Sequence, residues 1–403
     1  MVRLVLTTLG LAACHFRGPG FGEAGDGGID VGTLADVGMF PDGSVTPDAP
    51  VTPDAPVTPD APVTPDAATC TSWSRHFDSC GLPPPPATGL MLVGAVTFDS
   101  TTGVFSPTQA SSTYVVVNLP QLGGGPDASV LFVKSLDSAA TLRIVGTRAV
   151  IIASDSTIAI AGSIDAGSTL SGFRGPDANA SPCNAAGAGG ASGDGGGGGG
   201  GGFGSSGGAG GTGDNTGAAN AGAKGTSILP PAWVRGGCAG AGGLHANSGV
   251  AGASGGGLEL AARNSVMVAG RINAGGGAGG GAPGPKGGGG GGGSGGMIGL
   301  DAPMVTILSG AVLAANGGGA GGGADGAGSA SAGADATTAA VAGGGTGPNA
   351  LGGSGASGGS SATAGGNGLG SGGGGGGGGG VGYIVVHGAL TTAGTTSPAV
   401  TLQ

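Results

Sequence analysis

Charged and aromatic side chains are scarce in this chain of 403 residues. Charged residues make up 8 % of the sequence and aromatic residues 3 %, and there are four histidines. The 12 Lys and Arg residues are scattered, which excludes a basic face able to bind nucleic acid through its phosphates. An ordinary catalytic domain also fits poorly, because general acid–base and nucleophilic catalysis depend on titratable side chains. We therefore expect no enzymatic activity, no cofactor and no metal site.

Glycine, by contrast, is abundant. It accounts for 106 of the residues, and the net charge is −10. The glycines run together instead of recurring strictly at every third position, which excludes a collagen triple helix. The composition therefore indicates a glycine-rich structural protein that is not a collagen.

The N-terminus carries the features of an export signal. Arg3 precedes the apolar run 4–11, which small residues follow; this pattern predicts a signal peptide over residues 1–13 that is too short to span a bilayer as a helix. The sequence Leu11-Ala12-Ala13-Cys14 resembles the lipobox of bacterial lipoproteins, and the alternative is a chance Ala-Ala-Cys. The resemblance implies cleavage before Cys14 and lipid on its sulfur. Residue 15 is His and not Asp, which under the sorting rule of that family implies anchoring in the outer membrane.

Four cysteines remain once Cys14 is assigned to lipid. An exported chain favours disulfides, and proximity in the sequence suggests the pairs Cys70–Cys80 and Cys183–Cys238, one of three possible connectivities. A metal site is the competing interpretation, but the chain has no Cys-x-x-Cys and no neighbouring histidine to support it.

The composition divides the chain into segments. Residues 14–69 are predicted to form a lipidated N-terminus and a Pro/Asp-rich linker, because the closely spaced prolines of Val-Thr-Pro-Asp repeats prevent regular helix or sheet and favour an extended, disordered stalk. Residues 70–89 are a segment bracketed by cysteines that ends in a run of prolines. The folded part is expected over residues 90–403.

Three stretches of the folded part align without gaps: residues 150–166, 258–274 and 298–314. Apolar residues alternate along each of them, which is typical of short β-strands. A single unit cannot bury one of its faces, whereas stacked units can. We therefore predict an all-β fold, a β-solenoid resembling a parallel β-helix, with Ile160, Val268 and Leu308 in one inward column; a β-sandwich is the alternative.

Long glycine-rich tracts interrupt these units at residues 168–256, 275–297 and 315–380. They are either flexible or ordered through hydrogen bonds between extended polyglycine helices, and the sequence does not decide between the two. If the solenoid is the core, deleting residues 318–345 should change stability little. Strand units followed by glycine runs resemble the uncharacterised glycine-rich surface proteins of myxobacteria-like species, which implies no known activity. The tracts also resemble those of mycobacterial surface proteins, although the helical module of that family is missing.

Motifs that could carry chemistry are weak. Gly-x-Ser-x-Gly recurs by chance in such glycine-rich sequence, without the strand–turn–helix context that a hydrolase needs. His76, His245 and His387 are far in the sequence from plausible partners, and His245 is predicted to be a solvated loop residue. Outward positions of the strand units hold a small set of charged residues that we expect to form surface salt bridges: Glu259, Arg263, Arg271 and Asp301.

Together these features predict a surface-anchored structural or adhesive lipoprotein without catalytic activity. Its partners would be the membrane, through the lipid, and an extracellular glycan or matrix. The alternatives are a polysaccharide-processing β-helix enzyme and a protein that binds carbohydrate or ice through a flat glycine-rich face.

Overall fold

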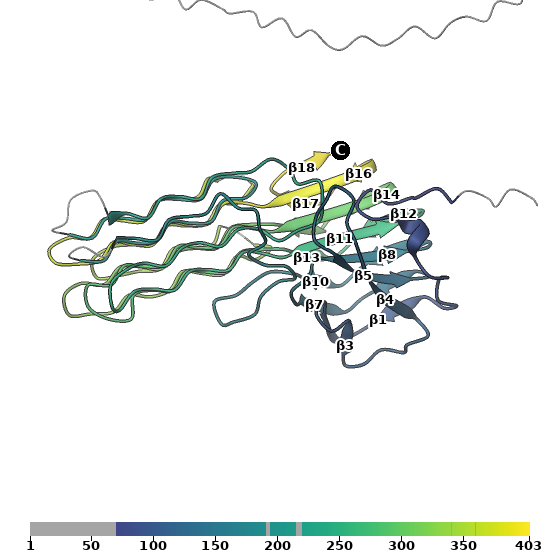
Figure 1. The fold of residues 1–403 in the computed structure, drawn as a ribbon, viewed down its shortest axis with the longest axis horizontal. Helices are drawn as coiled ribbons and strands as arrows, with labels where there is room; N and C mark the ends of the chain where they lie inside the picture. Colours follow the sequence, from purple (N-terminus) through teal and green to yellow (C-terminus); the bar gives the residue numbers. More distant parts are fainter. Residues whose placement is uncertain (1–69, 191–193, 215–219, 340, 359) are drawn as a thin grey trace, which may run out of the picture. The chain divides into compact units, whose positions relative to one another are not determined.

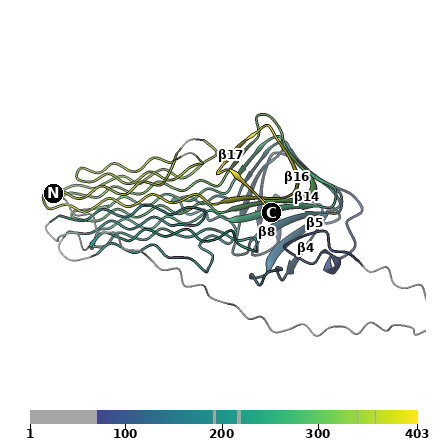
Figure 2. The ribbon, with the colours of Figure 1, turned by 90° about the horizontal axis from the view of Figure 1, so that it is seen from above.

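The computed structural model describes residues 70–403, apart from residues 191–193, 215–219, 340 and 359. The predicted signal peptide, Cys14 and the linker lie outside the described residues. The described chain forms a body of β-strands, from which a bundle of extended glycine-rich segments projects (Figure 1). Figure 2 shows these segments running side by side away from the strands.

Two sheets of 11 and 7 strands make up the β body. The larger sheet holds β1 (Leu90–Leu92), β4 (Tyr114–Leu119), β5 (Ala128–Val133), β6 (Leu136–Ser138), β8 (Val150–Ser154), β9 (Thr157–Ile160), β11 (Gly257–Ala262), β12 (Ser265–Val268), β14 (Met297–Ile307), β16 (Tyr383–Thr392) and β18 (Val400–Leu402). The smaller holds β2 (Ala95–Asp99), β3 (Val104–Ser106), β7 (Thr141–Val145), β10 (Ser163–Asp165), β13 (Arg271–Asn273), β15 (Val312–Ala314) and β17 (Thr395–Ser397). One short 3-10 helix, η1, spans Ser79–Gly81.

The alternation of apolar and polar residues explains the core of the body. Successive strand side chains point to opposite faces, so one apolar set turns inward. In the smaller sheet, Leu142, Ile164, Ile272 and Leu313 pair in parallel register, and each is at most 1 % exposed. The two sheets close round one continuous apolar core.

The prediction of a β-solenoid is wrong. The sheets are mixed, with antiparallel pairs β2–β3 and β4–β5 beside the parallel ones, and they wrap into a nearly closed body. The glycine-rich tracts are also not loops on a solenoid. They fold into a bundle with hydrogen bonds of its own. The body is therefore one of two ordered parts.

The ungapped alignment also fails in its third stretch. Leu258 pairs with Ile298 as aligned, but Val268 pairs with Ile307, and Ile272 pairs with Leu313. An irregularity in β14 between Asp301 and Met304 shifts the register. Because a shift of one residue turns a side chain to the opposite face, the predicted column is wrong at its third member. Leu308 is 39 % exposed, and Ile307 is buried in its place.

The glycine-rich tracts form a bundle of extended runs that lie side by side. Four interior runs span residues 195–202, 288–296, 317–324 and 373–380. Ten outer runs surround them, at residues 187–190, 207–213, 220–225, 237–244, 249–255, 274–282, 330–336, 342–346, 350–356 and 363–368. Figures 1 and 2 show the runs as long, nearly parallel lines.

Hydrogen bonds in the bundle repeat every three residues. In run 195–202, the N–H groups of Gly195, Gly198 and Gly201 donate to one neighbouring run, at Lys286, Gly289 and Gly292. The N–H groups of Gly196 and Gly199 donate to a second run, and those of Gly197 and Gly200 donate to a third. The carbonyl groups of run 195–202 accept hydrogen bonds from three further runs. Three residues per turn is the period of the polyproline II helix, which has no internal hydrogen bonds. In this bundle, neighbouring runs supply the missing partners.

Close packing explains why the interior runs are almost entirely glycine. A Cβ built on Gly197, Gly200 or Gly377 would lie 1.9–2.0 Å from a carbonyl oxygen of a neighbouring run. The interior runs therefore hold only small side chains beside glycine, such as Ala320, Ala324 and Ser294, and larger ones lie where a run faces solvent. Along the outer run 207–213 and the residue before it, side chains recur at every third position, as Ser206, Ala209 and Thr212. The spacing of non-glycine residues thus encodes which side of each run is exposed.

Candidate functional site

A segment closed by a disulfide covers part of the outer face of the larger sheet. Cys70 and Cys80 are bonded, and the buried Phe77 between them packs on Val130, Ile151 and Ala261. Trp73 contacts the Phe77 ring edge-on, at 5.7 Å between ring centroids. Strands β8 and β11 are therefore buried on both faces. We refer to residues 70–82 as the strap.

Four titratable residues meet beneath the strap. His76 comes from the strap, Glu259 from β11, Asp301 from β14 and His387 from β16, and all four are at most 5 % exposed. His76 Nδ1 contacts Glu259 Oε2 in a short ion pair. The rings of His76 and His387 lie 5.3 Å apart. Asp301 Oδ2 accepts a hydrogen bond from the backbone N–H of Arg75 at 2.9 Å. This group is called the buried cluster below.

Burial and neighbouring charge perturb the cluster. Burial and then the nearby Glu259 charge raise the pKa of Asp301 to about 6. Burial lowers the pKa of His76, but the charge and hydrogen bond of Glu259 outweigh that effect, so the net pKa is raised. The pKa of His387 is lowered by burial and by His76. Such shifts often mark functional sites, although structural ion pairs produce them too.

The sequence-based prediction for these residues was incomplete. Glu259 and Asp301 do occupy outward positions of the sheet, but the strap covers them, so they do not form surface salt bridges. His76 and His387 are not isolated, since each contacts this cluster. Arg263 does form a surface pair with Asp155, at 3.4 Å. His245, which we predicted to be solvated, is half-buried.

The chemistry open to the cluster is proton exchange among its own members. Glu259 Oε1 and His387 Nε2 are buried and have no hydrogen-bond partner among the described residues. The surface hollows described are lined mainly by small residues, such as Ser397 and Thr395, and none of them is lined by the cluster. A bulky substrate would have to displace the strap to reach the carboxylates.

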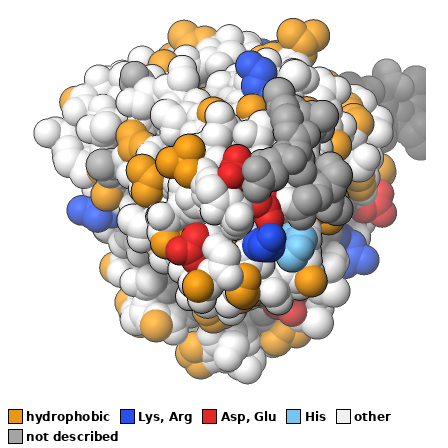
Figure 3. Space-filling view, turned by 90° about the vertical axis from the view of Figure 1, so that its left-hand side faces the viewer, with side chains coloured by type: hydrophobic (Ala, Val, Ile, Leu, Met, Phe, Trp, Pro, Cys, Tyr) orange, Lys and Arg blue, Asp and Glu red, His pale blue; other side chains and the backbone are white. Residues whose placement is uncertain are grey.

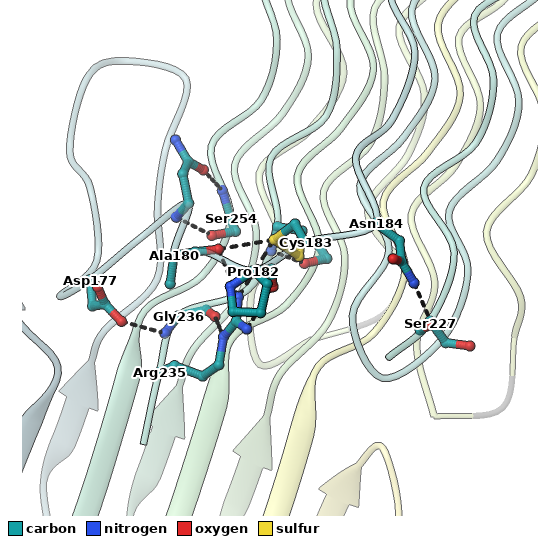
Figure 4. Close-up of a disulfide and its surroundings, with 12 residues drawn as sticks. Asp177, Ala180, Pro182, Cys183, Asn184, Ser227, Arg235, Gly236 and Ser254 are labelled. Carbon is teal, nitrogen blue, oxygen red and sulfur yellow. Dashed lines mark hydrogen bonds between the residues drawn. A yellow bond between two sulfur atoms is a disulfide. The ribbon is translucent and has the colours of Figure 1, made fainter. Parts of the chain in front are cut away.

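A second buried charge lies where the bundle meets the body. Arg235 is 1 % exposed, and its guanidinium donates to the carbonyl oxygens of Ala180 and Pro182, each at 2.7 Å (Figure 4). It also lies over the Phe203 ring, at 5.2 Å from its centroid. Burial lowers the pKa of Arg235, and it raises the pKa of the nearby Asp177. Because backbone carbonyls satisfy this arginine, we interpret it as structural.

The two predicted disulfides, Cys70–Cys80 and Cys183–Cys238, are confirmed, and they are compatible with an exported protein. The second joins the start of the first glycine-rich tract to the run 237–244 beside Arg235 (Figure 4). Its two cysteines are 55 residues apart, whereas those of the strap are 10 apart.

Replacing Cys183 and Cys238 together with serine should lower the free energy of unfolding by about 4 kcal/mol, because a longer closed loop removes more entropy from the unfolded chain. The Cys70→Ser/Cys80→Ser control closes a shorter loop and should cost less than about 3 kcal/mol. Denaturant titrations of both double mutants measure the difference. Equal losses would contradict the loop-length explanation.

Charged groups on the bundle gather at its far end, where the runs turn. Lys286 pairs with Asp194 there at 3.1 Å, and Asp325 Oδ1 accepts the backbone N–H groups of Ala327 and Gly328. Figure 3 looks onto this end and shows charged side chains of both signs, some of them side by side near the middle of the view, among backbone and small groups. No single-sign patch of the kind that steers a charged ligand is seen on this face.

Comparisons with known proteins give no indication of family or function. No family model matches the chain, and neither the curated proteins nor the solved structures include a match. Among the described residues, no helix is long and apolar enough to cross a membrane. The same residues include no group of three or more His, Cys, Asp and Glu side chains arranged to hold a metal ion.

Proposed function

We propose that this protein is an exported structural component of the cell surface, held in the outer membrane by lipid on Cys14. The Pro/Asp-rich linker would separate the anchor from the folded part, and the glycine-rich bundle would be the element displayed. The observation that carries the proposal is the hydrogen-bonded order of the bundle, together with the lipobox-like sequence Leu11-Ala12-Ala13-Cys14.

The bundle has properties that suit a stiff surface element. Each interior run bonds to neighbours in six directions, so it cannot bend without breaking contacts with several other runs. At about 3.1 Å per residue, an eight-residue run extends about 25 Å. Outward side chains are mostly alanine, serine and threonine, which present little apolar surface and little charge. These features favour a passive structural role.

Burial of the cluster also supports a role without catalysis. Hydrolysis of a glycoside needs two carboxyl groups on either side of the bond that is cut. Glu259 and Asp301 are 0 % and 5 % exposed beneath the strap, so they do not flank an open groove. A polysaccharide-processing activity therefore has less support than a structural function.

The Cys14→Ser variant tests the anchor. It should move the protein from the membrane fraction to the soluble fraction, because serine has no thiol to accept the lipid. Under the sorting rule implied by the resemblance, the His15→Asp control should keep the protein in membranes but shift it from the outer to the inner one. Immunoblots of separated fractions give the readout, and membrane-bound Cys14→Ser protein would refute the lipid anchor.

A second candidate function is binding to a flat, repetitive ligand such as an extracellular polysaccharide. It is favoured by the outer run 207–213 and the residue before it, since Ser206, Ala209 and Thr212 face outward there with a spacing of about 9 Å. Ala209→Lys should then reduce sedimentation with insoluble polysaccharides several-fold, while Ala334→Lys on a different outer run should not. Equal binding by both variants would remove this candidate.

A further inference from the structure

The strap is attached to the β body through two different contacts. Its apolar side, centred on Phe77, packs on the sheet and on Val234. Its polar side places His76 and the Arg75 backbone on the buried cluster. The strap also immediately follows the linker in the sequence, so it is the first part of the described body after residue 69.

The charges facing one another in the cluster come from every element packed there. They are His76 and Arg75 of the strap, Glu259 of β11, Asp301 of β14 and His387 of β16. The backbone carbonyl of Gln403 also approaches His387 Nδ1, at 3.3 Å. Arg75 is the one cation among them that is always charged, and this residue is exposed.

The net charge buried under the strap depends on whether His76 and Asp301 are protonated. With His76 protonated and Asp301 neutral, the imidazolium of His76 balances the carboxylate of Glu259. With both groups deprotonated, two carboxylates lie under the strap on adjacent strands, β11 and β14, without a buried cation facing them. Uncompensated buried charge is strongly unfavourable. Undocking of the strap would return both carboxylates to water.

We propose that the strap is a proton-dependent latch, closed over the sheet when the buried cluster is protonated and loosened when the cluster loses its protons. This inference does not depend on the proposed surface function, because it concerns the folded body alone. It assigns the cluster a conformational role that accounts for its position beneath a short segment held by a disulfide.

The directions of the pKa shifts agree with this proposal. For Asp301 and His76 the pKa is raised in the closed state, so closure is favoured at low pH and is lost as the pH rises through their closed-state values, about 6 for Asp301. His387 acts in the opposite sense. Its lowered pKa means that closure is weakened when the pH falls far enough to charge it. The Asp301 contribution to closure should therefore be complete below pH 3.8 and lost by about pH 6, and the His76 contribution should be lost as the pH rises above 6.5.

Hydrogen exchange of the full chain, measured by mass spectrometry between pH 3.5 and 7, tests the latch. After correction for intrinsic exchange rates, the Asp301 contribution to protection of a peptide over residues 73–82 should fall on the order of 100-fold across this range, since its shift of about two pKa units is worth about two factors of ten and is lost between pH 3.8 and about 6. Peptides from β7 and β10 serve as internal controls and should keep their protection.

Two variants locate the titrating group. Asp301→Asn should flatten the pH dependence, because the amide keeps an oxygen for the Arg75 N–H but cannot become charged. Asp137→Asn, at an exposed position of β6, should behave like the wild type. If Asp301→Asn does not fold, His76→Gln serves instead, and it should lower strap protection at pH 5.5 and reduce the slope.

Three results would overturn the latch. The first is a wild-type strap whose protection does not change with pH. The second is an unchanged slope in the substituted cluster. The third is an equal loss of protection in β7 and β10, which would assign the change to unfolding of the whole body.

Discussion

Replacing Gly377 with alanine should destabilise the protein by about 4 kcal/mol, whereas the same change at Gly343 should be neutral or slightly stabilising. A Cβ at Gly377 would lie 2.0 Å from the carbonyl oxygen of Gly208. Separating the two runs would also strain the bonds that Gly377 makes with Gly198 and Gly292. Overpacking costs about 1–3 kcal/mol, and a buried polar group that loses its partner costs a similar amount.

Gly343 is the matched control, because nothing lies within 4 Å of a Cβ built there. Alanine at such a site lowers the entropy of the unfolded chain and is worth about 0.5 kcal/mol. Thermal melts should place the Gly377→Ala midpoint on the order of 10 °C below that of the wild type. Similar melting temperatures for the two variants would contradict close packing of the interior runs.

Deleting residues 318–345 should abolish the cooperative fold of the bundle. The segment includes most of one interior run, which bonds to Gly376 and Gly379 on one side and to Gly279 on another. Removing it would leave those N–H groups without their partners inside the bundle. The prediction from the sequence was the opposite result, because it treated the tract as a loop that contributes little to the free energy of unfolding.

Circular dichroism and hydrogen exchange would test the deletion. The control removes residues 45–64 of the predicted linker and should leave the melt unchanged. Val268→Asp should also be strongly destabilising, because Val268 is fully buried in the β body and the aspartate would be an unpaired charge. A normal melt after deletion of 318–345 would mean that the bundle contributes little to stability.

The strands and disulfides could be predicted from the sequence because their signals are local. Alternating apolar residues identify the strands, and the spacing of Cys70 and Cys80 favours a pair. The register of the first two stretches was also predictable, since Leu258 pairs with Val150 and Ile272 with Ile164. The third stretch was aligned wrongly, because the irregularity in β14 was not considered, although Pro303 lies within it and a proline inside a strand often marks a bulge.

The pattern of glycine along the tracts indicates which runs are interior and which are outer, but the prediction from the sequence did not use it. Runs made almost wholly of glycine, such as 195–202 and 373–380, are interior. Runs with one larger residue in three, such as 207–213, have one exposed side. This period of three differs from the periods of helices and strands that are normally searched. The three-residue spacing of non-glycine residues was therefore the sequence pattern that could have predicted the bundle.

The buried cluster could not be found from the sequence, because its members are far apart along the chain. His76 and Glu259 are separated by 183 positions, and the strap that joins them lies outside the strand units. One local hint exists at Glu259, which lies between Leu258 and Leu260 in a strand whose residues are all buried. A charged residue in a strand that is buried on both faces needs a partner.

The scarcity of side chains in the interior runs also means that few side-chain contacts fix how one run is aligned along the next. Sliding one such run by a single turn, three residues or about 9 Å, would bring equivalent glycine groups opposite one another again. The phase of each run must therefore be set at its ends, by the strands of the β body and by turn contacts such as Lys286 with Asp194. Evolution could then lengthen or shorten a pair of runs by six residues, three outgoing and three returning, without redesigning the interior.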